Sequence, residues 1–188
     1  FTVLGMAFQA WLGKTVVDSN LAPYKITIHM VMALVIVAVI LYLIYASKTT
    51  YKSQKFDSKF RNIMIVATVL TLIQIVLGTQ VRQFVDVQNT LNGYHNWDIQ
   101  EFAPMNFYVH RSLSIIVLLL NGWLFMRNRK LQLGFNKFKL VITCIGLEIV
   151  TGIAMFYFDF PFSSQPLHIV IAAILIGIQF YIILESHN

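Results

Sequence analysis

Residues 26–46 read ITIHMVMALVIVAVILYLIYA, a run of 21 residues without a charged side chain. A helix of about 20 apolar residues is long enough to cross the hydrocarbon core of a bilayer. Five further stretches have a similar length and few charges: 1–17, 62–81, 107–126, 139–158 and 167–185. The sequence therefore predicts an all-α integral membrane protein with six transmembrane helices.

The composition excludes an ordinary soluble domain. The chain of 188 residues is 57% hydrophobic and 12% charged, whereas soluble domains are about 25% charged. The apolar stretches lack the alternation of a barrel strand, and an open sheet cannot satisfy its backbone polar groups in lipid. Each span should therefore be helical.

The basic residues mark the sidedness of the chain. The connection 48–61 holds five of them against one acid, and the connection 127–139 holds five and no acid. Short loops rich in Lys and Arg stay in the cytoplasm, so both connections and both ends of this chain should lie there. The formal charge of +6 thus reflects topology, and we expect membrane lipid, not nucleic acid, as a partner.

Three stretches share a polar residue four positions before a glycine: FQAWLGKTVVD at 8–18, IQIVLGTQVR at 73–82 and LEIVTGIAMFY at 147–157. The next predicted helix then begins with a histidine in its first turns, at His29, His110 or His168. Equivalent positions of the first and third copies lie 139 residues apart, as in the pairs Gln9 and Glu148, Gly13 and Gly152, His29 and His168. This common offset indicates a duplicated hairpin.

A duplication of four helices would give the middle copy, with Gln74, Gly78 and His110, a counterpart upstream of Phe1. We therefore expect an eight-helix protein made of two pseudo-symmetric four-helix bundles, of which this chain holds six helices. In this interpretation 1–47 is the second hairpin of the N-terminal half, 48–61 is a cytoplasmic loop and 62–188 is the complete C-terminal bundle.

Three histidines at one depth in a membrane call for a common explanation, because a histidine in hydrocarbon is costly without a partner. His110 and His168 should face the inside of one bundle, where two neutral imidazoles can take both axial positions of a haem iron. His29 is the repeat equivalent of His168, so it should ligate haem iron in the other half. A single histidine of this kind is more often a hydrogen-bonded core residue, and zinc is a weaker alternative because no carboxylate or cysteine stands at ligand spacing.

Two arginines should lie at the outer level of these histidines. Arg82 closes the third predicted span and Arg111 follows His110, so both could pair with haem propionates. The alternative is that they reach to lipid headgroups. Glu148 lies mid-span and should be protonated or hydrogen-bonded inside the bundle, as a structural contact more than a catalytic one. His95 and His187 are expected in solvent.

Four motifs together resemble the haem A synthase family: VVDSNLAPYKITIHMVMAL at 16–34, LGTQVR at 77–82, VHRSLS at 109–114 and PLHIVIAAIL at 166–175. The resemblance spans nearly the whole chain. It maps 1–47 onto the third and fourth helices of that family and 61–188 onto the fifth to eighth.

The resemblance implies a membrane enzyme that oxidises a methyl group of haem O to a formyl group. In a bacterium, this enzyme would lie in the cytoplasmic membrane. The product is the haem A of terminal oxidases. It implies a haem b on His110 and His168 and places His29 beside the substrate haem. The catalytic carboxylate of the family belongs to the hairpin expected upstream of Phe1, and Glu148 does not match it. An enzyme that supplies haem O and an electron donor are the implied partners, and the chain could form a homo-oligomer.

The chain departs from the family pattern in one respect, and two alternative functions would also use its histidines. Many members carry a cysteine pair in an outer loop, but residues 82–109 contain no cysteine, which puts a thiol-linked role of this half in doubt. A di-haem b-type electron-transfer protein would need the same histidines without substrate chemistry. A haem-free membrane scaffold would use them as polar helix contacts.

Overall fold

The structure is a computed structural model that describes residues 2–19, 22–49, 54–93, 97, 99–158 and 163–186. Its regular structure in these ranges is entirely helical, which confirms the predicted all-α class. The helices are α1 (Thr2–Asp18), α2 (Pro23–Ala46), α3 (Ser58–Asn92), the single turn α4 (Ile99–Phe102), α5 (Met105–Leu131), α6 (Phe138–Tyr157) and α7 (Ser164–Glu185).

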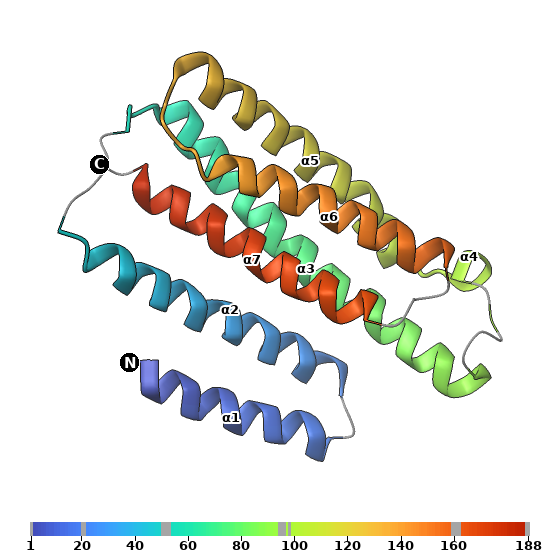
Figure 1. Cartoon of the computed structure of the whole chain (residues 1–188). Coiled ribbons are helices and arrows are strands. Elements are labelled where there is room, and N and C mark those ends of the chain that lie inside the picture. The colour runs from blue at the N-terminus through green and yellow to red at the C-terminus, as the bar shows by residue number, and fades with distance from the viewer. Residues whose placement is uncertain are drawn as a thin grey trace.

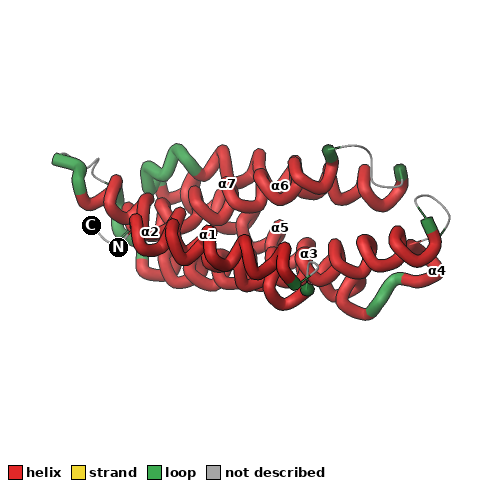
Figure 2. The backbone as a smooth tube through the Cα atoms, turned by 90° about the horizontal axis from the view of Figure 1, so that it is seen from below, coloured by secondary structure: helices red, strands yellow, loops and turns green. Residues whose placement is uncertain are grey.

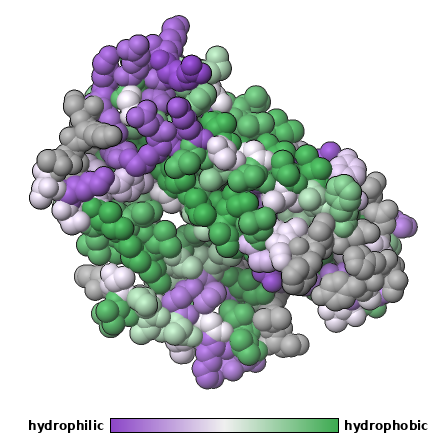
Figure 3. Space-filling view, in the orientation of Figure 1, coloured by the Kyte–Doolittle hydropathy of each residue, from purple (hydrophilic) through white to green (hydrophobic). Residues whose placement is uncertain are grey.

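Five of these helices, α2, α3, α5, α6 and α7, are long and apolar enough to cross a membrane. α1 has 17 residues, about 26 Å of helix against a hydrocarbon core of about 30 Å. The sixth span therefore stays a prediction. A band of hydrophobic residues crosses the middle of the molecule, and hydrophilic residues gather at the end where α5 leads into α6 (Figure 3).

The third helix is longer than the predicted span, and the prediction that Arg82 closes this helix is wrong. α3 continues to Asn92, where Gly93 ends it with a φ of 84°. The extension is polar, so it carries no hydropathy signal, but it has helical supports. Arg82 pairs with Asp86 one turn later at 3.5 Å, and Val85 is fully buried.

The last four long helices form a ring in which each packs on two neighbours, in the order α3, α5, α6, α7 and back to α3. Seen from below, α6 and α7 make one layer of this bundle and α3 and α5 the other (Figure 2). α5 and α7 therefore lie diagonally across the bundle.

The hairpin of α1 and α2 stands beside this ring, with α2 against α3 and α7 (Figure 1). Two of its contacts with the bundle lie near opposite ends of α2. A Cβ on Gly177 of α7 would lie 3.4 Å from Cδ1 of Leu41, so the glycine admits the leucine side chain. Near the other end, the hydroxyl groups of Thr27 and Thr79 are 2.8 Å apart.

The bundle core combines apolar packing with one buried amide pair. Phe60 stacks on Phe135 with ring centroids 4.9 Å apart, and Phe138 meets Phe60 edge-on. Gln179 and Asn121 are both fully buried, and Gln179 Nε2 donates to Asn121 Oδ1 at 3.1 Å.

Ion pairs tie the two basic connections together at one end of the molecule. Asp57 caps α3 by accepting from the Phe60 amide at 2.6 Å, and it also accepts from Arg127 Nη2 of α5 at 2.7 Å. This arginine is the main reason that the pKa of Asp57 lies below its ordinary value of 3.8. Glu185, at the end of α7, pairs with Lys137 at 2.5 Å. Both connections thus reach one end, as their shared charge predicts.

Candidate functional site

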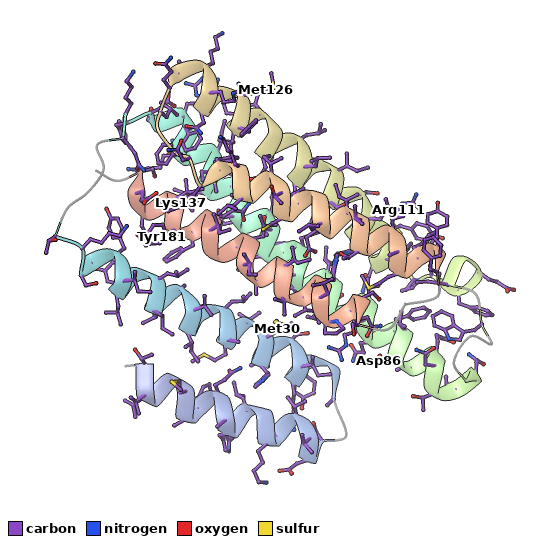
Figure 4. All side chains as sticks on the ribbon, in the orientation of Figure 1. Met30, Asp86, Arg111, Met126, Lys137 and Tyr181 are labelled. Carbon is purple, nitrogen blue, oxygen red and sulfur yellow. The ribbon has the colours of Figure 1, made fainter. Side chains whose placement is uncertain are left out.

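The three repeat histidines lie at the end opposite the basic connections. His29, His110 and His168 occupy the second turn of α2, α5 and α7, and each is half-buried. Arg111 and Asp86 mark this end, whereas Lys137 and Tyr181 mark the other (Figure 4).

Each histidine ring packs against the glycine of its own repeat. A Cβ built on Gly13 would lie 3.2 Å from Cε1 of His29, and one on Gly78 would lie 3.3 Å from Cε1 of His110. The corresponding distance from Gly152 to His168 is 3.9 Å. Carbon atoms at optimal contact are about 3.5–4.0 Å apart. In the first two repeats the missing side chain therefore makes room for an imidazole, which is more specific than the close helix approach that glycines in membrane helices usually permit.

The polar residue one turn before each glycine also reaches its histidine. Gln9 and Gln74 donate to the backbone carbonyls of His29 and His110 at 3.0 and 2.6 Å. Glu148 behaves differently, because its Oε2 lies 3.0 Å from the ring atom Nε2 of His168. Gln74 thus holds the helix that carries its histidine, Gln9 contacts both the backbone and, at 3.3 Å, the ring atom Nε2 of His29, and Glu148 contacts the ring of His168.

His168 has a second partner that the others lack. Its Nδ1 lies 2.7 Å from the hydroxyl of Thr151 on α6. Leucines stand at the equivalent positions of the other copies, Leu12 and Leu77. In the described part of the chain, Nδ1 of His29 and Nδ1 of His110 are buried without a hydrogen-bond partner. Sequence reasoning missed Thr151, although a hydroxyl beside the repeat glycine was visible.

The ring of helices places two of the histidines on opposite sides of one bundle. α5 and α7 are diagonal, so His110 and His168 stand on helices from opposite sides of the bundle, each in the second turn of its helix. His29 lies on α2, outside this ring and against α1. Two imidazoles from diagonal helices at one depth can offer two nitrogen ligands to a group between them.

The arginines predicted at this level have partners within the protein. Arg111 lies over the ring of Phe156 in α6, with Cζ 5.5 Å from its centroid. Arg82 is half-exposed and paired with Asp86. His95 and His187 lie outside the described residues. In the ranges that the structure does describe, no three His, Cys, Asp or Glu side chains come together as a metal-binding group.

A family model of cytochrome oxidase assembly proteins, COX15-CtaA, matches residues 1–180. The chain belongs to this family. No curated protein sequence and no solved structure matches it significantly. Membership of COX15-CtaA confirms the resemblance and gives this membrane protein a role in the assembly of cytochrome oxidase.

Proposed function

We propose that this protein is a haem A synthase, which oxidises a methyl group of haem O to a formyl group and so supplies haem A to terminal oxidases. The observation that carries the proposal is the placement of His110 and His168 on diagonal helices of one bundle, at one depth. Family membership supports the oxidase connection, and the histidine pair supports a haem.

The residues around this pair suit a haem b. Gly78 leaves room for the ring of His110, whose buried Nδ1 has no partner among the described residues. His168 is held from both sides, by Thr151 at Nδ1 and Glu148 at Nε2. Ligation through Nε2 requires that Glu148 give up this contact. A haem b bound here would supply one-electron redox chemistry, and the protein's part is to orient two imidazoles in a dry bundle.

His29 is assigned to the substrate half, with 1–47 as one hairpin of that half and 62–188 as the haem b bundle. Its Nδ1 is buried and unpartnered in the described structure, and Gln9 Nε2 approaches its Nε2 at 3.3 Å. Glu148 faces His168, so we assign it to the second half and not to the oxidation. We assign no residue of this chain as the carboxylate that acts on haem O.

Arg82 and Arg111 are proposed partners of the haem propionates at the same end. Arg82 lies one turn beyond Gly78, and Arg111 adjoins His110. A propionate would compete with Asp86 for Arg82, whereas Arg111 can stay over Phe156 and still offer its N–H groups, because a guanidinium stacks through its face and donates from its edge.

The same proposal sets the membrane orientation and the partners. The basic end would face the cytoplasm and the histidine end the opposite side of a bacterial inner membrane, with both chain ends inside. Catalysis further requires an enzyme that supplies haem O and an electron donor, and a homo-oligomer is compatible with the arrangement.

Pigment extraction from the purified full-length protein tests the proposal. Haem O or haem A together with protohaem is the expected result, and the spectrum should be that of a low-spin haem with two histidine ligands. His110→Ala and His168→Ala should each abolish the low-spin protohaem signal. His29→Ala is the matched control, because it should lower the content of haem O or A and leave that signal in place.

Two results would overturn the proposal. Protohaem as the sole pigment would indicate a b-type electron carrier. A protein without a Soret band, or one whose band is unchanged in His110→Ala and His168→Ala, would indicate a haem-free scaffold or other ligands.

A further inference from the structure

The hydroxyl of Thr151 is placed to select the tautomer of His168. Its oxygen lies 2.8 Å from the carbonyl of Leu147 and 3.1 Å from that of Glu148. Carbonyl oxygens accept and cannot donate, so both contacts are satisfied when the hydroxyl proton is directed to the carbonyls. The lone pairs that remain on Thr151 Oγ1 can only accept, and the atom 2.7 Å away is Nδ1 of His168. With the hydroxyl proton directed in this way, Nδ1 is the donor.

This hydrogen bond fixes the proton on one side of the ring. With the proton on Nδ1, a neutral His168 carries its lone pair on Nε2, so its contact of 3.0 Å with Glu148 Oε2 requires that the carboxyl group carry the proton and donate it. Nε2 is thus the available ligand atom once Glu148 releases it. A hydrogen bond donated by the far nitrogen also makes an imidazole a more basic ligand.

The two members of the proposed ligand pair differ in this respect. Nδ1 of His110 is buried and has no partner in the described structure, because Leu77 stands where α6 has Thr151. Of the two repeat histidines in this bundle, His168 therefore has a fixed tautomer and His110 does not.

We propose that Thr151 is a positioning residue that holds His168 in the Nδ1–H tautomer, makes it the stronger ligand of the pair and thereby lowers the reduction potential of the bound haem. This inference rests on the proposed function. A more basic ligand stabilises ferric over ferrous iron, and hydrogen bonding to an axial ligand is one of the means by which a protein sets this balance.

Potentiometric titration of the full-length protein, followed at the haem absorption bands, tests the inference. Thr151→Val keeps the shape of the side chain and removes the hydroxyl. Loss of such a partner changes metal affinity about 10- to 100-fold. Only the part of this change that differs between ferric and ferrous iron moves the potential, by about 59 mV for each tenfold difference in a one-electron couple, and we expect an upward shift.

Thr71→Val is the matched control. Thr71 is also buried in the same bundle, but its hydroxyl donates to the carbonyl of Ala67 at 2.9 Å and has no hydrogen bond to a histidine among the described residues. Its potential should equal that of the wild type. A reciprocal variant, Leu77→Thr, offers His110 the hydroxyl that it lacks and should lower the potential.

The outcomes separate the inference from the proposed function. A wild-type protein without a bis-histidine haem overturns the proposed function, and the inference with it. A Thr151→Val protein that keeps its haem at the potential of Thr71→Val overturns the inference alone. If Thr151→Val retains no haem, Leu77→Thr decides: a lower potential supports the inference, and an unchanged one overturns it.

Discussion

Gly78 offers a direct test of how tightly the histidine end is packed. In Gly78→Ala the new Cβ would lie 3.3 Å from Cε1 of His110, so the ring or the helix α5 must retreat by a few tenths of an ångström to reach normal contact. Overpacking of this kind costs about 1–3 kcal/mol, and the higher helix propensity of alanine returns about 1 kcal/mol. We expect a net loss of stability of up to about 2 kcal/mol and a displaced imidazole.

Other glycines of the same bundle separate the cost of overpacking from the gain in helix propensity. A Cβ on Gly122 or Gly146 meets nothing within 4 Å, so Gly122→Ala and Gly146→Ala should gain up to about 1 kcal/mol from propensity alone. Gly152→Ala should resemble them, because its Cβ would lie at an ordinary contact distance of 3.9 Å from His168.

Thermal unfolding in detergent and the haem content per chain are the two measurements. Gly78→Ala should melt below Gly122→Ala and bind less haem, with a weakened low-spin spectrum. If Gly78→Ala melts with Gly122→Ala and binds as much haem as the wild type, the room beside the His110 ring is not needed and the reasoning fails.

Two further substitutions probe the rest of the bundle. Asp57→Asn removes the charge that caps α3 and binds Arg127, and it should lower the free energy of unfolding by about 1–2 kcal/mol at neutral pH. Because the pKa of Asp57 is lowered in the folded protein, its stabilisation is complete above the unfolded pKa and disappears as the pH falls through the lower folded pKa. The melting curves of wild type and variant should therefore converge in acid. Gln179→Leu leaves Asn121 Oδ1 without its donor in the fully buried pair and should lower the free energy of unfolding by about 1–2 kcal/mol. The double variant Gln179→Leu, Asn121→Leu should lose less stability than the sum of the two single variants. Strict additivity would argue against the hydrogen bond.

The predicted spans correspond to helices because hydropathy and helix length are set by the same bilayer. The repeat also located the histidines, since each glycine is followed by a histidine in the first turns of the next long helix, 16 residues on in the first and third copies and 32 in the middle one. What hydropathy could not show is the end of α3, because the residues from Arg82 to Asn92 are stabilised by an i,i+4 pair and by a buried valine, not by an apolar run.

The contacts of the polar residues were the harder part of the site. Glu148 was expected to be hydrogen-bonded inside the bundle, and it is, but that its partner is the ring of His168 depends on how α6 and α7 face each other. The pairing of Asn121 with Gln179 likewise joins residues 58 positions apart. One sequence shows that such residues need partners in lipid, but the partner is chosen by the packing of helices.

The length of α3 has a consequence for anything that approaches the protein from the histidine end. Its 35 residues make a rod of about 52 Å, some 20 Å more than a hydrocarbon core is thick. The surplus beyond Arg82 stands as a post, braced where the indole of Trp97 donates to Asn89 at 2.8 Å. A partner protein with a flat surface would contact this end of α3 before it reached the lipid surface. If the hydrocarbon core ends near Arg82, a partner that comes close on this side must therefore have a recess for the end of α3 or bind alongside it.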